Sequence, residues 1–341
     1  MWYDAGEILS YNCLFNFVVG NRGGGKTFNA KERMIKRFIK NGEQFIYLRR
    51  YKEEIKNVDK FFDDIAYKFP NFEFHVNGKE FYCKPKNGKG KITDKKYHMG
   101  GALALTRGIT LKSVPYPHIS FIIFDEFITD PTTYYRYLNN EVEQFFDMYE
   151  TICRTRDNVR VLFLANAISV VNPYFLYFDV KVDGNKRFIR PLDDVIVEMY
   201  KDDTFIKNKL QTRFGRLISR TRYGKYAINN EFKNDNSDFI EKKSNNAKLQ
   251  NIIHFNEIDV GFWYDFKEGK IYASSKIDKT CPFQYTLKRD DQKPNLMLIK
   301  NAKDNYYVSN IMKAFEMGYL FYENHNIKNI CYEIMKTLHY S

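Results

Sequence analysis

Apolar residues near the start of the chain change their spacing twice, and the changes predict a strand, a helix and a second strand. The continuous apolar run Leu14–Val19 is typical of a buried strand. After a glycine-rich turn, Thr27–Lys40 places its apolar residues at helical spacing, and Asn41-Gly42 ends the pattern. Gln44–Leu48 is the next apolar run. Strand, helix and strand within this short stretch indicate a βαβ unit with a parallel sheet.

Later apolar runs add elements to this sheet. Asn77-Gly78 is a hairpin signal, because it separates two short alternating stretches, Phe72–Val76 and Lys79–Cys83. Further along, apolar runs predict two more buried strands with a helix between them: Ile119–Phe124, Glu141–Cys153 and Val159–Ala165.

The pattern changes beyond Pro191. Residues 204–230 contain seven basic residues and no acidic ones, and Asn234–Asn246 is polar, as in a linker or loop. Short strands separated by Gly, Asp and Pro turns are predicted within 251–275 and 281–299. Helical spacing then predicts two closing helices, Val308–Tyr322 and Ile327–Leu338.

Length and charge limit the class of protein. The chain has 341 residues, about right for two domains, and 44% of them are hydrophobic. The formal net charge of +12 favours an acidic partner, with nucleic acid first and an anionic membrane surface second. A basic surface that serves only solubility is the alternative.

Cysteines and apolar segments indicate the compartment. The five cysteines are widely spaced and odd in number, so we expect free buried thiols in a reducing cytosol. The N-terminus lacks the apolar core of a signal peptide, and no apolar run is long enough to span a membrane. We therefore expect a soluble protein with no membrane partner.

A phosphate-binding motif follows the first predicted strand. Residues 20–27 read GNRGGGKT and match G-x-x-x-x-G-K-[ST] at every fixed position. Such glycines let the backbone N–H groups wrap phosphates, and the following helix directs its positive end at them. Lys26 would reach the β- and γ-phosphates of ATP, and the Thr27 hydroxyl would ligate Mg²⁺. The predicted nucleotide-binding residues are Gly20, Asn21, Arg22, Gly23, Gly24, Gly25, Lys26 and Thr27.

Two adjacent acids end the apolar strand Ile119–Phe124. Asp125 suits a Mg²⁺ ligand, and Glu126 suits the general base that activates the attacking water. Asn166, at the end of the next predicted strand, is a candidate sensor of the γ-phosphate, with a simple turn as the equal alternative. This arrangement is typical of RecA-like P-loop ATPases with an additional strand and a catalytic glutamate. Their sites usually lie between subunits, where a neighbour supplies an arginine.

Several strings resemble one family, the DNA-packaging ATPases of small tailed phages, or phi29-like terminase motors. They are VVGNRGGGKTF, FIYLRRYKEEI, ALTRGITLKS with PHISFIIFDEFI, and RTRDNVRVLFLANAISVVNPYF, within residues 14–180. The second string and the end of the last are more specific than the phosphate and acid motifs.

The resemblance implies an ATP-driven motor that translocates double-stranded DNA. It implies a homo-oligomeric ring, most commonly a pentamer, on the portal of an empty prohead in the host cytoplasm, and leaves open whether a scaffold RNA takes part. The family pattern implies the same roles for Lys26, Thr27, Asp125 and Glu126. It also implies that Arg154 is the catalytic arginine that acts in the site of a neighbouring subunit. The other trans-acting candidates are Arg156, Arg160, Lys52 and Lys112.

The pattern along the chain predicts a P-loop ATPase domain over 1–200, a basic connector over 201–245 and a smaller α+β domain over 246–341. The resemblance implies that this last domain is similar to an RNase H-like nuclease. A nuclease needs clustered carboxylates for two metals. Asp259, Asp265 and Asp278 show no such signature. We therefore expect this domain to be catalytically silent, with a role in docking or DNA grip.

Two basic segments are candidates for DNA contact. Lys84–Lys96 carries six lysines against one acid, which suits phosphate contacts that read no sequence. Arg213, Arg216 and Arg220 fall near one face if their stretch is helical. A solvated loop, an exposed face and a contact between subunits are the alternatives. Two other functions remain open from the sequence: a regulatory NTPase that does not translocate, and an ATP-dependent nuclease.

Overall fold

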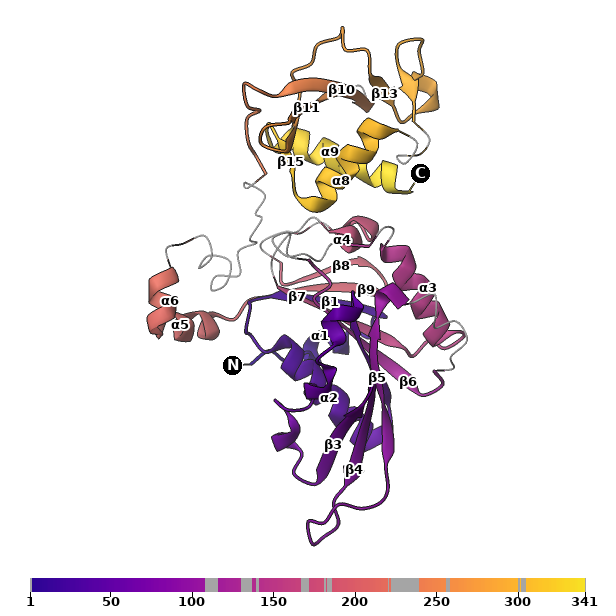
Figure 1. Ribbon diagram of the computed structural model, residues 1–341, viewed down its shortest axis with the longest axis vertical. Coiled ribbons are helices and arrows are strands. Elements are labelled where there is room, and N and C mark those ends of the chain that lie inside the picture. The colour runs from indigo at the N-terminus through magenta and orange to yellow at the C-terminus, as the bar shows by residue number, and fades with distance from the viewer. Residues whose placement is uncertain are drawn as a thin grey trace. The chain divides into compact units, whose positions relative to one another are not determined.

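The structure is a computed structural model that divides into two compact units, residues 1–233 and 234–341 (Figure 1). It describes residues 2–107, 116–129, 137–138, 141–166, 172–180, 182, 186–219, 221, 239–255, 258–299, 301 and 305–340. The basic helices α5 (Asp203–Gln211) and α6 (Arg213–Ile218) belong to the first unit.

The described part of the first unit is built on a nine-stranded sheet with the order β3-β4-β5-β2-β6-β7-β1-β9-β8. The six strands from β5 to β9 in this order are parallel. The antiparallel hairpin β3-β4 lies at one edge beside β5, and the single antiparallel strand β8 lies at the other edge beside β9. The strands are β1 (Phe15–Gly20), β2 (Gln44–Arg49), β3 (Phe72–Asn77), β4 (Glu80–Pro85), β5 (Tyr97–Ala104), β6 (Ile119–Asp125), β7 (Arg160–Asn166), β8 (Phe188–Leu192) and β9 (Val195–Tyr200).

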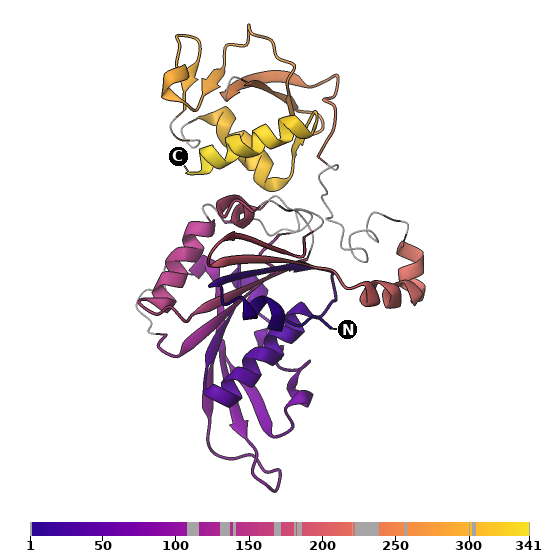
Figure 2. The same cartoon turned by 180° about the vertical axis from the view of Figure 1, so that it is seen from behind.

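Helices cover both faces of this sheet (Figures 1 and 2). One face packs on α1 (Gly6–Ser10), α2 (Lys26–Asn41) and the 3₁₀ turns η1 (Lys52–Ile55) and η2 (Val58–Lys60). A third turn, η3 (Ala66–Lys68), follows and has no buried residue. The other face packs on α3 (Glu141–Cys153) and α4 (Pro173–Tyr177). Because neighbouring strand residues point to opposite faces, Phe17 enters the α3 side and Val18 the α2 side. The Phe17 and Phe163 rings stack with centroids 4.1 Å apart.

These elements confirm the predicted α/β fold with a mostly parallel sheet. The predicted βαβ unit is β1, α2 and β2, and the predicted helix over Glu141–Cys153 is α3. Strand β5 was not predicted, because Gly100 and Gly101 interrupt its apolar pattern. Gly100 has φ 116°, and a Cβ there would come within 1.9 Å of the Phe45 carbonyl oxygen. Glycine is therefore required for β5 to lie beside β2.

In its described residues, the second unit holds a sheet with the order β14-β13-β10-β11-β12-β15 and the α-helices α8 and α9. Three antiparallel strands form its centre, and β13 runs parallel to β10. The predicted smaller α+β domain is thus confirmed. Its elements are β10 (Lys248–Phe255), β11 (Ile258–Asp265), β12 (Lys270–Ser274), β13 (Gln284–Thr286), η5 (Arg289–Asp291), β14 (Met297–Leu298), α8 (Tyr306–Met317), β15 (Leu320–Tyr322) and α9 (His325–Tyr340).

One predicted boundary in this unit is wrong. The helix expected over Val308–Tyr322 ends at Met317, because Gly318 adopts a left-handed conformation with φ 74° and caps it. The chain then forms β15, which pairs with β12. The apolar residues of β15 continue the helical spacing, so the pattern alone does not mark the end of α8.

All five cysteines are free and buried. Within the described ranges, no helix has both the length and the apolarity that a membrane span requires.

Candidate functional site

The glycine-rich turn joins the carboxyl end of β1 to the amino end of α2. Gly23 and Gly25 have φ values of 82° and 84°, in a left-handed region that other residues adopt only with strain. Gly25 is the N-cap of α2, whose first turn has no acidic residue. The turn can therefore direct backbone N–H groups and the positive end of α2 at an anion.

Lys26 lies under this turn and is only 6% exposed. Its ammonium donates to the carbonyl oxygens of Gly20 (3.0 Å) and Asn21 (2.7 Å) and to Oδ1 of Asn166 (3.3 Å). Burial lowers the pKa of Lys26 to about 8, although the Asp125 carboxylate opposes this shift. Since Asn166 pairs in register with Gly20 across β7 and β1, the predicted sensor position lies beside the phosphate-binding turn.

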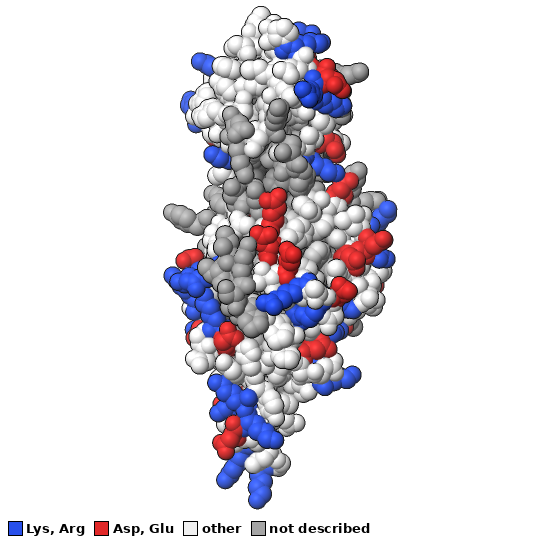
Figure 3. Space-filling model, turned by 90° about the vertical axis from the view of Figure 1, so that its right-hand side faces the viewer, with Lys and Arg blue, Asp and Glu red and all other residues white. Residues whose placement is uncertain are grey.

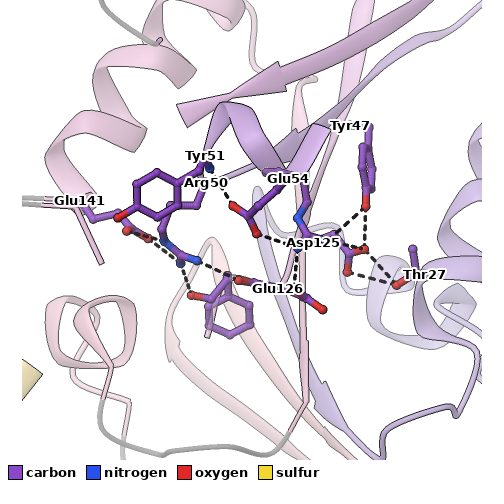
Figure 4. A network of polar contacts seen from close by, with 10 residues as sticks. Thr27, Tyr47, Arg50, Tyr51, Glu54, Asp125, Glu126 and Glu141 are labelled. Carbon is purple, nitrogen blue, oxygen red and sulfur yellow. Dashed lines mark hydrogen bonds and ion pairs between the residues drawn. The ribbon is translucent and has the colours of Figure 1, made fainter. Parts of the chain in front are cut away.

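Asp125 ends β6 and faces Thr27 (Figure 4). Its two carboxylate oxygens accept from the Thr27 hydroxyl at 3.1 and 3.2 Å, and one also accepts from the Tyr47 hydroxyl at 2.9 Å. Strand β7 lies between β6 and β1, as expected for a P-loop core with an additional strand. Carboxylate and hydroxyl oxygens are the ligands that Mg²⁺ prefers, so Thr27 and Asp125 fit the predicted metal site.

Glu126 follows Asp125 with a left-handed backbone, φ 58°. Its side chain is 56% exposed, so water can reach the carboxylate. The carboxylate accepts from Nη2 of Arg49 at 2.5 Å. The same guanidinium group bonds Glu54 at 2.7 Å and lies 3.7 Å from Asp125. Arg49 therefore lies between Asp125, the predicted Mg²⁺ ligand, and Glu126, the predicted base, and fixes the direction of the Glu126 side chain.

Sequence reasoning missed Tyr47 and Arg49. Both lie at the end of β2, which neighbours β6 in the sheet although the two strands are far apart in the chain. Burial and the nearby Asp125 carboxylate raise the pKa of Tyr47, so its hydroxyl stays a donor to Asp125. The available signal was the polar string that follows the apolar run of β2, because strand ends at this edge share one site.

A buried ion pair supports the backbone of Glu126 from behind (Figure 4). Arg50 and Glu141 are 2% and 0% exposed at their side chains and bond each other at 2.7 and 2.8 Å. Arg50 also donates to the carbonyl oxygens of Glu126 (3.1 Å) and Phe127 (2.6 Å). The Tyr174 hydroxyl donates to Glu141 at 3.0 Å. The left-handed turn at Glu126 is thus held by a charge that is itself fully paired.

Glu141→Gln should destabilise the first unit by about 3–5 kcal/mol, because it leaves the Arg50 charge buried without its partner. Glu143 lies exposed in the same turn of α3, so Glu143→Gln is a control with the same change of charge. Urea unfolding followed by Trp2 fluorescence in a Trp263→Phe background reports on the first unit. Equal midpoints for the two variants would contradict this role of the pair.

The three arginines after α3 have different environments. Arg156 donates to five carbonyl oxygens, among them Tyr116 and Ile119 at the start of β6. Arg160 bonds Asn12 and the Leu9 carbonyl. Arg154 is exposed, and no bond to its guanidinium group is found among the described residues. Arg156 and Arg160 therefore hold the fold together, whereas Arg154 is available to another molecule.

Arg154 lies far from the phosphate-binding turn of its own chain. Its neighbour Arg156 contacts the start of β6, whereas Asp125 ends that strand. Six residues of extended strand span about 20 Å, which exceeds the reach of an arginine side chain. In one chain, Arg154 thus lies near the amino ends of the parallel strands, whereas Glu126 lies at their carboxyl ends.

The remaining candidates lie at the surface or beyond the described ranges. Arg22 in the turn and Lys52 at the start of η1 are exposed. Lys112 and Arg220 lie outside the described residues. Arg213 and Arg216 are both exposed on α6.

The lysine-rich segment joins β4 to β5 at one end of the first unit, where Figure 3 shows Lys and Arg side chains gathered. A tight turn at its tip is closed by Asn87, whose backbone N–H donates to the Lys91 carbonyl. The exposed lysines are Lys89, Lys91, Lys95 and Lys96. Of these, Lys96 lies 3.7 Å from the centre of the Tyr82 ring. The others extend into solvent and form a basic tip.

The three acids considered above have other partners in the structure. Asp265 accepts from the backbone N–H groups of Lys267 and Glu268 in a turn, Asp278 accepts from Thr280, and Asp259 pairs with His254. No group of three or more metal-ligating side chains occurs among the residues that the structure describes.

Comparison with known proteins identifies relatives over the whole chain. A family model described as "Podovirus DNA encapsidation protein (Gp16)" matches residues 1–339. The DNA packaging protein of Bacillus phage phi29 is 40% identical over 338 residues, which cover 99% of this chain and 98% of the relative. The DNA packaging protein of Bacillus phage B103 is 39% identical over 331 residues, 97% of this chain and 99% of the relative.

Two solved structures resemble the chain as well. One is a chain of the bacteriophage Phi-29 viral genome packaging motor assembly, with 39% identity, a TM-score of 0.59 and 99% of both chains covered. The other is the N-terminal domain of the DNA packaging ATPase from bacteriophage phi29, with 42% identity and a TM-score of 0.52. It covers 60% of this chain and 98% of that one. The chain therefore belongs to the family of podovirus DNA encapsidation proteins.

Proposed function

We propose that the protein is an ATP-hydrolysing motor that translocates double-stranded viral DNA into an empty prohead. The observation that carries the proposal is the meeting of Lys26, Asp125 and Glu126 at one edge of the sheet, in a chain from a DNA-packaging family. The regulatory and nuclease alternatives have less support, because the relatives are named DNA packaging proteins and no metal-ligating cluster occurs among the described residues of the second unit.

In this proposal each residue at the sheet edge has one task. The glycine turn and Lys26 bind the phosphates, and Asn166 reports the γ-phosphate because it shares the Lys26 ammonium. Glu126 takes the proton of the attacking water, since it is the exposed carboxylate beside the phosphate site. Arg49 directs Glu126, and the Arg50–Glu141 pair holds its backbone.

Mg²⁺ would be held by Thr27 and Asp125, whose oxygens already face each other at 3.1 Å. Bound there, the ion would neutralise charge on the β- and γ-phosphates during transfer. Tyr47 would keep the Asp125 carboxylate turned towards Thr27.

The site is completed by a second subunit in this proposal. Arg154 is too far from its own Glu126, yet it is exposed and unbonded to described residues, as a contribution to a neighbour requires. Arginine suits that task because its planar group can bond two phosphate oxygens and stays charged. The proposed assembly is a homo-oligomeric ring, a pentamer by the family resemblance, with or without a scaffold RNA.

The ring would act at the portal of the prohead in the host cytoplasm. DNA contact is assigned to the lysine-rich segment Lys84–Lys96 and its basic tip, with Arg213 and Arg216 as further candidates. The second unit, without a described carboxylate cluster, is assigned a catalytically silent role in docking or DNA grip. The domain assignment of 1–200, 201–245 and 246–341 remains part of this proposal.

Stimulation of hydrolysis by DNA tests the proposal. MgATP turnover is measured with and without double-stranded DNA, in the presence of proheads that carry the cognate portal. A motor should hydrolyse ATP faster when DNA is present. Turnover that ignores DNA, with DNA left uncleaved in Mg²⁺ or Mn²⁺, would favour a regulatory NTPase. Plasmid cleavage would favour a nuclease.

Neutralising the basic tip should weaken DNA binding to the same extent for all sequences. Lys89→Gln with Lys91→Gln removes two exposed charges, and the slope of log K against log salt should fall by roughly 2. Lys56→Gln with Lys60→Gln, at exposed positions near η2, is the control with the same change of charge. An unchanged slope for the tip variant would assign the loop to solvation alone.

A further inference from the structure

The N-terminal segment is fixed against the phosphate-binding turn by several bonds. The Tyr3 backbone N–H donates to the Gly24 carbonyl at 3.0 Å, and its hydroxyl donates to the buried Glu198 on β9 at 2.8 Å. The next bonds lead to α2: the Ala5 N–H donates to Oδ1 of Asn29 at 2.9 Å. Tyr3 is 1% exposed. The N-terminal segment is therefore an ordered part of the site and lies against the phosphate-binding turn.

Trp2 directly precedes the buried Tyr3, but its own side chain is 70% exposed. Its ring lies so close to the last glycine of the turn that a Cβ at Gly25 would come within 2.2 Å of it. Its other neighbour is Phe28, with ring centroids 5.8 Å apart and planes tilted by 40°. Phe28 is itself partly buried on the core. A large apolar ring is thus held in place at the turn while most of its surface faces solvent.

A ring at this position is within reach of the base of a nucleotide whose phosphates occupy the turn. Phosphates that occupy the turn lie on the first N–H groups of α2, and only the ribose separates the α-phosphate from the base.

We propose that Trp2, supported by Phe28, is the stacking platform for the base of the bound nucleotide. The inference rests on the proposed ATPase function and adds the residue that recognises the base. An aromatic ring can bind a base by stacking, without hydrogen bonds to the edge of the base, because every base has a π-face. Trp2 touches the base rather than the reacting phosphate, so its loss should raise KM for ATP and leave kcat unchanged.

The two tryptophans of the chain allow a direct test. Trp263→Phe, in the second unit, leaves Trp2 as the single tryptophan, and Glu126→Gln prevents turnover during titration. Fluorescence is recorded with MgATP and with magnesium tripolyphosphate, which carries the phosphates but no base. We expect MgATP to change the Trp2 emission and tripolyphosphate to change it far less.

Affinities of the Trp2 variants complete the test, with tripolyphosphate measured by calorimetry. Trp2→Ala should weaken MgATP binding by roughly 5- to 100-fold and leave tripolyphosphate binding unchanged, whereas Trp2→Phe should bind ATP almost as tightly as the parent. Equal weakening of both ligands would overturn the inference and make Trp2 a support of the turn. Unchanged ATP binding by Trp2→Ala would also overturn it. A parent chain that binds neither ligand would overturn the proposed function itself.

Discussion

Replacing Glu126 with glutamine should lower the rate of ATP hydrolysis by about 10²–10⁴-fold, because glutamine does not accept the proton of the attacking water. MgATP affinity should stay within about threefold of wild type, since Lys26, Thr27 and Asp125 keep their contacts. Turnover is measured by phosphate release at saturating ATP, and affinity by calorimetry. A variant that hydrolyses ATP at a near wild-type rate would remove Glu126 from the role of base.

Lys26→Ala is the matched contrast. It removes the charge that lies under the glycine turn, so both binding and hydrolysis should fall. A Lys26→Ala protein with unchanged ATP affinity would contradict the assignment of the turn to the phosphates. The pair of variants therefore separates the binding group from the group that acts on water.

Mixing two inactive variants should restore part of the ATPase activity. Arg154→Ala should hydrolyse ATP roughly 10³–10⁵-fold more slowly than wild type while it still binds ATP. In a mixed ring, an Arg154→Ala subunit supplies an intact Glu126, and a Glu126→Gln neighbour supplies an intact Arg154. We expect one site to use residues of two subunits because β6, about 20 Å long, separates Arg154 from Glu126 within one chain.

The control for this mixture is a chain that carries both substitutions. Mixed with Glu126→Gln, it forms no interface that holds both an intact Glu126 and an intact Arg154, so activity should stay absent. Dilution that dissociates the rings should also abolish the restored activity. If assembled mixtures of the single variants stay inactive, Arg154 does not act in trans, and Lys52 or Lys112 becomes the next candidate.

The parts of the site that are contiguous in the chain were predictable from the sequence. The turn, Lys26 and Thr27 lie within one motif, and Asp125 and Glu126 follow one apolar strand. Each motif follows the carboxyl end of a strand, and these ends meet at one side of a parallel sheet, so their meeting follows from the predicted parallel sheet. Asn166 was predicted for the same reason, because it ends the strand between them.

Contacts between distant segments were not predictable in this way. Arg49 meets Glu126 only because β2 is placed beside β6, and single-sequence patterns do not give that neighbour. The Arg50–Glu141 pair joins residues 91 positions apart. Charged residues are expected at the surface, so the sequence alone does not predict that these two are buried. Trp2 precedes the first predicted element, so no periodicity relates it to the turn.

A DNA packaging assay tests most directly whether ATP hydrolysis at this site drives a motor. Purified proheads with the cognate portal are incubated with double-stranded DNA, MgATP and the protein, and the DNA protected from added nuclease is quantified. We expect wild-type protein to protect DNA only when ATP is hydrolysed, and Glu126→Gln to protect none although it binds ATP. Full protection by Glu126→Gln, or by wild-type protein without ATP, would contradict a motor driven by hydrolysis at this site.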